Sequence, residues 1–240
     1  MRLDKLLERE KIGSKKAVKR LLLRKAVTVD GKPAESEGMN VDPVIQEIKI
    51  FEKTLKTTGH SYFMMNKPKG AVTAVKDAKH TTVLDLLADR DKNEKLYPVG
   101  RLDRDTEGLL LITDNGPLGY QLIHPSKKVV KRYEVIVNEP LSIEDCRQFA
   151  EGITFTGGQQ CQPAELHILS SSSKQSLAYL DIQEGKFHQV KKMFLSVGKK
   201  VIYLKRLSMG SLFLDSKLKP GEYRRLEPEE LKLLMLYFKK

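Results

Sequence analysis

The sequence predicts an α+β protein whose larger, C-terminal part is built on a mixed, largely antiparallel sheet flanked by helices. Helix-like and strand-like stretches do not alternate strictly along the chain, which disfavours a doubly wound parallel sheet. Residues 109–112 (LLLI) lie between a glycine and the turn Asp-Asn-Gly at 114–116, a pattern typical of a fully buried strand. A length of 240 residues allows one large domain or two smaller ones with a real core.

Two short helices are predicted at the N-terminus. Leu3, Leu6 and Leu7 have the i, i+3, i+4 spacing that places apolar side chains on one helix face. Ser14 is a good N-cap for a second helix, which should run from residue 15 to about residue 25. This second helix has one apolar face, and its other face is basic.

A hairpin and one more strand complete the N-terminal part. Residues 27–34 (VTVDGKPA) contain an Asp-Gly turn between two short strand-like pieces, which indicates a tight hairpin. Residues 44–51 (VIQEIKIF) are predicted to form a strand. We expect residues 55–59 (LKTTG) to be a hinge, so that the chain divides into domains at 1–57 and 58–240.

The elements of the second part follow from the same signals. Strands are predicted at 62–65, 109–112, 127–137, 165–168, 177–182, 201–204 and 209–214. Helices are predicted at 82–87, at 141–152 with Ser142 as N-cap, after Gly185 with Phe187, Val190 and Phe194 on one side, and near 229–238. The Pro and Gly that follow the first of these strands should hold Lys67 and Lys69 in a loop.

The charge of the chain favours a polyanionic partner. There are 43 Lys and Arg residues against 31 Asp and Glu, a formal net charge of +12. The first 25 residues contain ten basic and three acidic residues, so contact with nucleic-acid phosphates is expected there. A membrane is the poorer partner, because no apolar run approaches the roughly 20 residues that a span requires. The basic face of the second predicted helix carries Lys15, Lys16, Lys19, Arg20 and Arg24.

Several other classes of function lack the residues that they need. No apolar signal-peptide core follows Met1, so a cytoplasmic location is expected. Cys146 and Cys161 are too few for a disulfide framework and lack the spacing of a zinc site. There is no glycine-rich dinucleotide loop, no Walker loop and no H-E-x-x-H. We therefore expect neither a metal nor an organic cofactor.

The charged loop before residue 108 is the candidate reactive segment. It leads into the predicted buried strand, and loops held by a rigid scaffold are where reactive side chains usually lie. Asp103 and Asp105 would point the same way in an extended loop and would diverge in a turn. The alternative is a solvated surface loop in which these carboxylates pair with Arg101 and Arg104. The residue types alone leave both interpretations open.

Two family resemblances bear on this choice. Residues 1 to about 55, with RLDKLLERE and KIGSKKAVKRLLLRKAVTVDGK, resemble the S4 RNA-binding domain. The segments GRLDRDTEGLLLIT, KRYEV and EGKFHQVKKMF resemble the RsuA-type ribosomal-RNA pseudouridine synthases, in the order and spacing of that family. The resemblance implies an S4 domain followed by a catalytic domain that detaches uracil from ribose at N1, rotates it and rejoins it through C5.

The same resemblance implies roles for individual residues. Asp103 aligns with the essential aspartate of the family, which attacks the substrate or removes a proton. Lys191 aligns with its basic partner, where other branches carry Arg, and Tyr133 aligns with a tyrosine whose ring stacks on the flipped-out base. Arg101 should contact phosphate or fill the space that the base leaves. His188 is expected to be structural.

The implied substrate is a uridine of 16S rRNA, because H-Q-V-K-K-M-F and Gln-Pro-Ala at 162–164 resemble the small-subunit branch. We expect a monomer that acts on an rRNA assembly intermediate, with Lys67, Lys131 and Lys192 as further phosphate contacts. Two alternatives remain: a synthase for 23S rRNA, and a non-catalytic S4-type assembly factor. A methyltransferase would require a glycine-rich cofactor loop, and the sequence has none.

Overall fold

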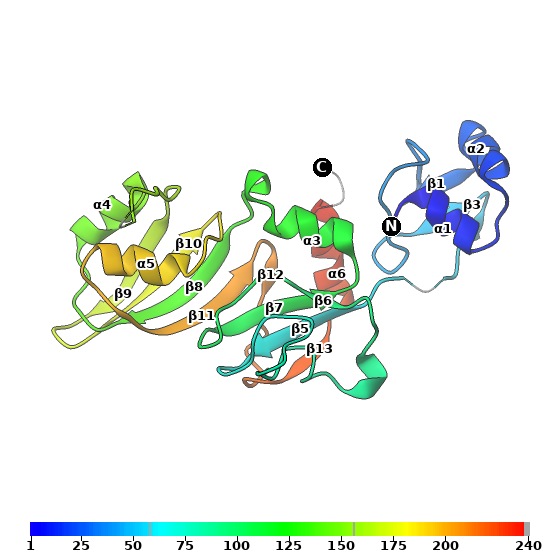
Figure 1. Ribbon diagram of the computed structural model, residues 1–240. Helices are drawn as coiled ribbons and strands as arrows, with labels where there is room; N and C mark the ends of the chain where they lie inside the picture. The colour runs from blue at the N-terminus through cyan, green and yellow to red at the C-terminus, as the bar shows by residue number, and fades with distance from the viewer. Residues whose placement is uncertain (58, 156, 238–240) are drawn as a thin grey trace.

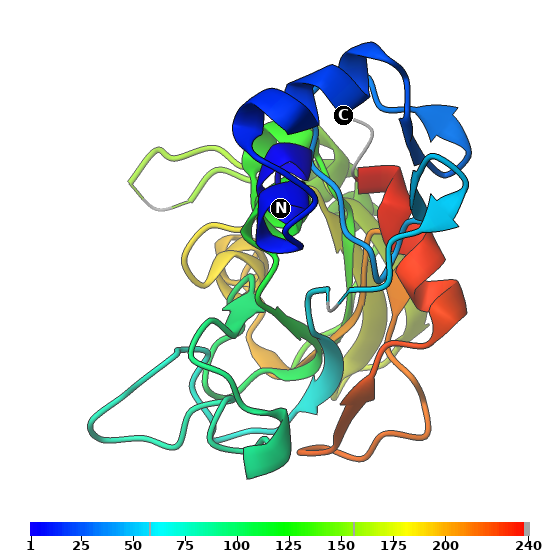
Figure 2. The ribbon, with the colours of Figure 1, turned by 90° about the vertical axis from the view of Figure 1, so that its right-hand side faces the viewer.

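The computed structural model describes residues 1–57, 59–155 and 157–237. It contains two separate sheets, one of four strands and one of nine. Figure 1 shows a small N-terminal module beside one end of the larger sheet. Figure 2 views the molecule from that end, with the helices of the N-terminal module in front of the larger sheet. The predicted α+β class is confirmed.

The N-terminal module has two helices and a four-stranded antiparallel sheet. Its elements are α1 (Leu3–Arg9), α2 (Lys15–Leu23), β1 (Val27–Val29), β2 (Lys32–Pro33), β3 (Ile48–Ile50) and β4 (Lys53–Thr54), with the strand order β2-β1-β3-β4. Leu3, Leu6 and Leu7 are fully buried and pack against the strands, as their spacing predicts. Ser14 caps α2 by accepting a hydrogen bond from the N–H of Ala17.

The strand predicted at 44–51 is wrong over its first half. The N–H groups of Ile45 and Gln46 both donate to the carbonyl of Asp42, which closes a turn. The carboxylate of Asp42 also accepts from the N–H of Val44 at 2.9 Å. Such local bonds from an aspartate compete with strand pairing, so that only β3 remains extended.

The larger module is the nine-stranded sheet with its helices. Its strands are β5 (Tyr62–Lys67), β6 (Tyr97–Val99), β7 (Glu107–Thr113), β8 (Lys131–Val137), β9 (Glu165–Ser171), β10 (Ser176–Ile182), β11 (Val201–Met209), β12 (Leu212–Phe213) and β13 (Tyr223–Arg225). The main path runs β13-β5-β7-β11-β8-β10-β9, with β6 paired to β7 and β12 paired to β11. Among the described strand pairs of this sheet only β7 and β11 are parallel, which confirms the predicted mixed, largely antiparallel arrangement.

Within the described residues, four helices and three 3₁₀ turns accompany this sheet. They are α3 (Gly116–Ile123), α4 (Ile143–Glu151), α5 (Gln189–Ser196) and α6 (Pro228–Leu234), with 3₁₀ turns at Asp89–Asp91, Pro125–Lys127 and Met235–Tyr237. Ser142 caps α4 as predicted and forms a capping box with Asp145. The ring centres of Phe149 in α4 and Phe194 in α5 are 4.9 Å apart. Both helices lie over the β8–β10 end of the sheet (Figure 1). Residue 238, the predicted end of the last helix, lies outside the described residues.

Four predictions for this module are wrong. The strand predicted at 127–137 begins only at residue 131, because residues 125–127 form a 3₁₀ turn and Lys128 has a left-handed backbone conformation. The helix predicted at 82–87 is a turn, because the N–H of Thr82 donates to the carboxylate of Asp85 at 2.7 Å and the N–H of Asp85 donates back to the threonine hydroxyl. The separate strands predicted at 201–204 and 209–214 are one long strand, β11, followed by the short β12. Phe187 does not join the apolar side of α5, because the helix begins after it and its side chain is 67% exposed.

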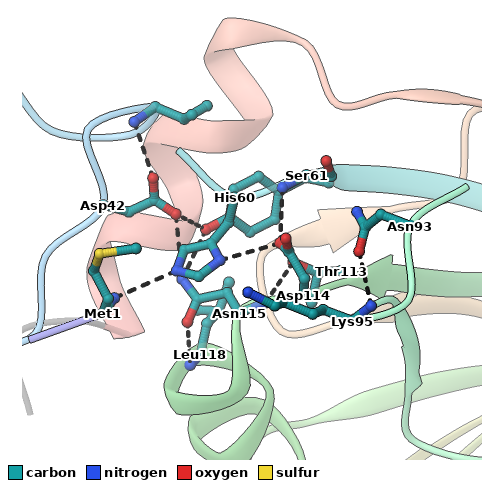
Figure 3. A network of polar contacts seen from close by, with 12 residues as sticks. Met1, Asp42, His60, Ser61, Asn93, Lys95, Thr113, Asp114, Asn115 and Leu118 are labelled. Carbon is teal, nitrogen blue, oxygen red and sulfur yellow. Dashed lines mark hydrogen bonds and ion pairs between the residues drawn. The ribbon is translucent and has the colours of Figure 1, made fainter. Parts of the chain in front are cut away.

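Polar contacts join the two modules (Figure 3). The carboxylate of Asp42, fully buried, accepts hydrogen bonds from the hydroxyl of Tyr62 and, at 3.3 Å, from Nδ2 of Asn115. The amine of Met1 lies 3.4 Å from Nε2 of His60. Asn115 also caps α3, so the position of the N-terminal module is tied to a helix of the larger one.

Candidate active site

The loop between β6 and β7 is fixed by hydrogen bonds that its backbone carbonyl groups accept. Nζ of Lys67 donates to the carbonyls of Arg104 at 3.3 Å and Thr106 at 2.8 Å. On the other side of the loop, the hydroxyl of Thr73 donates to the carbonyl of Leu102 at 2.8 Å. Residue 103 therefore lies between two anchored positions, and its carboxylate projects from a loop of fixed shape.

Lys67 is not a phosphate contact, contrary to the sequence prediction. It is the last residue of β5 and is 0% exposed, with its ammonium group turned toward backbone carbonyls. Burial lowers the pKa of Lys67 to about 8, against the opposing effect of the nearby Asp105 and Asp103. Its role in the structure is to shape the loop.

Two loop carboxylates converge on one lysine. Nζ of Lys191, in α5, lies 3.0 Å from Oδ2 of Asp103 and 2.6 Å from Oδ1 of Asp105. Nε2 of His188 lies 3.6 Å from the other carboxylate oxygen of Asp103. This histidine is the residue before α5, with φ of 53°. Asp105 thus pairs with Lys191 and not with Arg101, the alternative that the sequence left open.

Lys191 and Asp105 shift each other's pKa toward the charged form. Burial alone would lower the pKa of Lys191, but its hydrogen bonds to Asp105 and Asp103 outweigh burial and raise it. Burial would likewise raise the pKa of Asp105, yet the hydrogen bond and charge of Lys191 hold that pKa below its usual value. The loop therefore presents Asp103 beside a fixed cation.

Asp103, His188 and Lys191 line a pocket of about 340 Å³. Its lining includes the loop with Asp103, the start of α5, Tyr133 from β8 and Leu204 from β11. Tyr133 is 7% exposed, and its alternation in β8 turns it to the buried face of that strand. Arg101 is exposed and also lines the pocket. A pocket of this size with apolar walls and a few converging charges suits one flat aromatic base.

Arg206 lines the same pocket and is a residue that the sequence analysis does not identify. It lies in β11 directly opposite Tyr133, is 1% exposed, and donates from Nε to the carbonyl of Leu109 at 2.8 Å. The sequence prediction leaves residues 205–208 between two strands. The only sign of this residue in the sequence is an arginine within a stretch of apolar and basic residues. The pairing of β11 with β7 and β8 turns the side chain of this arginine inward.

The remaining predicted RNA contacts fall in different surroundings. Lys192 is half-buried, with Nζ 5.2 Å from the ring centre of Phe187 and 5.6 Å from that of Phe155. Lys131 is buried, donates to the carbonyl of Val129 at 3.0 Å and lines the pocket, so the phosphate contact predicted for it has no support from an exposed position. The predicted basic residues of α2 are all exposed: Lys15, Lys16, Lys19, Arg20 and Arg24.

One cluster within the described residues has ligand atoms close enough to hold a metal. Oxygen and nitrogen atoms of Glu165, His167 and Asp181 lie within 4.8 Å of one another. Arg132 already engages both oxygens of Asp181 with hydrogen bonds of 2.8 and 2.5 Å. None of the three lines the pocket around Asp103. Separately, no helix in the described part of the chain has the length and apolar character to cross a bilayer.

Comparison with known proteins matches both modules to families. Residues 61–196 match the RNA pseudouridylate synthase family, and residues 1–43 match the S4 domain. An uncharacterised RNA pseudouridine synthase of Bacillus subtilis, YtzG, is 45% identical, with 98% of each chain covered. The ribosomal small subunit pseudouridine synthase A of Yersinia pestis is 39% identical over 96% of this chain and 97% of its own, and that of Escherichia coli is 35% identical over 96% and 98%.

A solved structure of a pseudouridylate synthase has the same fold along the whole chain. It is 32% identical in sequence, with a TM-score of 0.67, and the superposition covers 98% of this chain and 99% of the other. The pocket, with its carboxylate, cation and aromatic wall, lies within the matched residues or in the strand that directly follows α5. The chain therefore belongs to the RNA pseudouridylate synthase family and is a pseudouridine synthase with an N-terminal S4 domain.

Proposed function

We propose that this enzyme converts one uridine of 16S rRNA to pseudouridine, with Asp103 as its catalytic carboxylate. The observation that carries the assignment of Asp103 is its 3.0 Å contact with Lys191 in a pocket that Tyr133 also lines. The choice of 16S rRNA is supported by the relatives from Yersinia pestis and Escherichia coli, which are named ribosomal small subunit pseudouridine synthases. A uridine of 23S rRNA is the alternative.

The reaction needs one carboxylate that stays ionised while the base is enclosed. Asp103 attacks the substrate, or removes a proton from it, while uracil is detached at N1, turned and rejoined through C5. The proton leaves C5, and N1 gains one, so that the isomerisation is balanced without an oxidant or a reductant. Lys191 keeps a positive charge beside the carboxylate throughout.

Tyr133 and Arg101 contact the RNA but do not make or break covalent bonds in the reaction. A uridine that leaves its helix loses stacking, and the ring of Tyr133 offers a face that replaces part of it. Arg101 is exposed next to the pocket, which suits a contact with phosphate or with the space that the base leaves. The substrate must expose its target base, so we propose an assembly intermediate and not a finished subunit.

The rest of the RNA is proposed to lie along the basic side of the protein. The exposed lysines and arginines of α2 supply an affinity that falls with salt, and Lys192 adds a contact near the pocket. We place the S4 domain at 1–57 and the catalytic domain at 58–240, since the two sheets have separate cores. We propose that the enzyme acts as a monomer.

The test is to map pseudouridine across 16S and 23S rRNA by carbodiimide-dependent primer stops. Cells that lack the protein are complemented with wild type, Asp103→Asn or Asp105→Asn. The two variants are matched, because both carboxylates contact the same Nζ of Lys191 and both lie on the same loop. We expect one 16S stop that returns with wild type and with Asp105→Asn, and that stays absent with Asp103→Asn.

Any other result contradicts one specific part of the proposal. A stop that returns in 23S rRNA keeps the chemistry and replaces the substrate. A stop that returns with Asp103→Asn shows that this carboxylate is not essential. If fully assembled small subunits are modified as fast as free 16S rRNA in vitro, the assembly intermediate is not the required substrate.

A further inference from the structure

Arg206 is a buried cation with incomplete hydrogen bonding. Its Nε donates to the carbonyl of Leu109, while Nη2 is buried and has no hydrogen-bond partner among the residues that the structure describes. Within the same part of the chain, no carboxylate forms an ion pair with it. An unpaired N–H on a buried guanidinium is costly, so its retention beside a pocket points to an acceptor that arrives with the substrate.

The guanidinium is placed where the base must lie. Arg206 pairs with Tyr133 across β11 and β8, so both side chains rise from the same face of the sheet into the pocket. A Cβ added to Gly100 would lie 3.7 Å from Nη1 of Arg206, so the guanidinium also adjoins the start of the catalytic loop. A base that stacks on the tyrosine ring therefore has its edge next to this arginine.

The pocket wall around Arg206 is electropositive. Lys131 lines the same pocket two residues before Tyr133 in β8, and burial together with the charge of Arg206 lowers its pKa to about 8. The carboxylates of Asp103 and Asp105 are already engaged by Lys191. Two buried cations without an anionic partner of their own, in the described residues, favour a ligand atom that carries or gains negative charge.

Uracil provides such an atom during the reaction. If the C1′–N1 bond breaks, its electron pair remains on the base and the charge is shared by N1, O2 and O4. If a carboxylate oxygen of Asp103 bonds to C6 instead, the C5–C6 π electrons shift toward the C4 carbonyl and the charge reaches O4. O4 becomes negative in both routes, whereas a phosphate of the RNA backbone is charged from the start and belongs nearer the exposed Arg101.

We propose that Arg206 donates a hydrogen bond to O4 of the target uracil and stabilises the negative charge that this oxygen gains. The proposal rests on the uridine-isomerising function argued above. It also accounts for both orientations of the base. Exchanging N1 and C5 turns the ring about the axis through N3 and C6, and this turn brings O2 to the place of O4. One fixed guanidinium then holds a carbonyl oxygen before and after the turn.

The experiment combines an Arg206 variant with a changed substrate atom. An RNA fragment that contains the mapped uridine is prepared with uridine, 4-thiouridine or 2-thiouridine at that position, since sulfur is a poor hydrogen-bond acceptor. Turnover of wild type, Arg206→Met and Arg206→Lys is measured at saturating RNA, together with the Kd for RNA and the thermal stability of each protein. Arg206→Lys keeps a cation in place if Arg206→Met fails to fold.

We expect 4-thiouridine to slow wild type by about tenfold or more, the size of one hydrogen bond to a charged donor. In the folded Arg206 variant, turnover is low with the uridine and the 4-thiouridine RNA, and the thio effect falls to about twofold or less, because the two changes remove the same contact. The Kd for RNA stays near that of wild type.

Three results overturn the proposal. An equal thio effect in wild type and variant means that O4 is not the partner of Arg206. A variant with normal turnover but weaker, less salt-dependent RNA binding identifies a phosphate contact. A variant that is sensitive to 4-thiouridine but has lost the effect of 2-thiouridine assigns Arg206 to O2. Failure of the proposed function is distinct from these, because wild type would then leave unmodified uridine in the fragment.

Discussion

At the scale of single residues, Lys67 and Lys131 show two uses of a buried lysine. Burial lowers the pKa of both to about 8. Lys67 gives its donors to the carbonyls of the catalytic loop, whereas Lys131 has one hydrogen bond, to the carbonyl of Val129. The charge of Lys67 is therefore used to fix the loop. The charge of Lys131 lies beside the pocket, and its burial lowers the stability of the folded protein.

We predict that Lys131→Met raises the stability of the free enzyme at pH 7 and lowers its activity. A fall of the pKa from 10.5 to about 8 corresponds to roughly 3 kcal/mol of unfavourable burial. Loss of the bond to Val129 offsets roughly 1 kcal/mol of this gain. Urea unfolding should show a net increase of about 1–2 kcal/mol. The matched variant Lys67→Met should be less stable than wild type, because it leaves loop carbonyls without donors.

The stability difference between Lys131→Met and wild type should depend on pH. Below pH 8, Lys131 is charged in the folded and the unfolded chain, and the cost of burial is present in full. Between pH 8 and about 10.5 the folded chain loses the proton first, so wild type gains stability relative to the variant as the pH rises. A difference that stays constant up to pH 10 would show that the buried charge is not its origin.

At the scale of elements, the parallel pairing of β7 with β11 sets the position of the pocket. Gly108 pairs with Arg206, and a Cβ at Gly108 would lie 2.2 Å from the carbonyl oxygen of Arg206. Its φ of +106° is also unfavourable for other residues. Only glycine lets the two strands approach this closely at the exit of the catalytic loop.

We predict that Gly108→Ala destabilises the protein by about 2–4 kcal/mol and lowers turnover, because β11 must shift and carries Arg206 with it. Gly198→Ala is the matched control: its φ is +77°, but a Cβ there meets nothing within 4 Å. The control should cost only about 1 kcal/mol from backbone strain. Urea unfolding compares the two variants, and equal losses would show that close strand approach is not the reason for the glycine.

The sequence predicts the elements that local signals define. Ser14 and Ser142 cap their helices, and the run 109–112 lies within the fully buried part of β7, because capping and apolar runs act over a few residues. The turn at 82–87 depends on hydrogen bonds between nearby side chains and backbone. The continuity of β11 depends on its pairing with a neighbouring strand. The pattern of apolar residues in the sequence contains neither kind of information. Prediction of the site has the same limit. Asp103, Tyr133 and Lys191 are found through motifs, whereas the burial of Arg206 arises only when β7, β8 and β11 assemble.

At the scale of the whole molecule, one buried carboxylate connects the two modules. Asp42 belongs to the N-terminal module, and its partners Tyr62 and Asn115 belong to the larger one. Burial and the neighbouring Asp42 raise the pKa of the Tyr62 hydroxyl, so it remains a proton donor. These hydrogen bonds hold the N-terminal module against the larger one (Figure 3).

We predict that Tyr62→Phe loosens the N-terminal module, because Asp42 stays buried between the modules without its hydroxyl donor. Limited trypsin digestion should cut faster within residues 52–61, and the Kd for RNA should rise, while turnover at saturating RNA stays near that of wild type. Tyr97→Phe is the matched control, since that hydroxyl donates to the carbonyl of Asn115 within the larger module, at 3.0 Å. Tyr62→Phe loses two hydrogen bonds, one donated to Asp42 and one accepted from Nδ2 of Asn115, whereas Tyr97→Phe loses one. Each bond is worth about 1 kcal/mol in a neutral pair and more to a charge, and only Tyr62→Phe breaks a contact between modules. If the two are cut at the same rate and bind RNA equally well, the carboxylate does not hold the modules together and the position of the S4 domain has another origin.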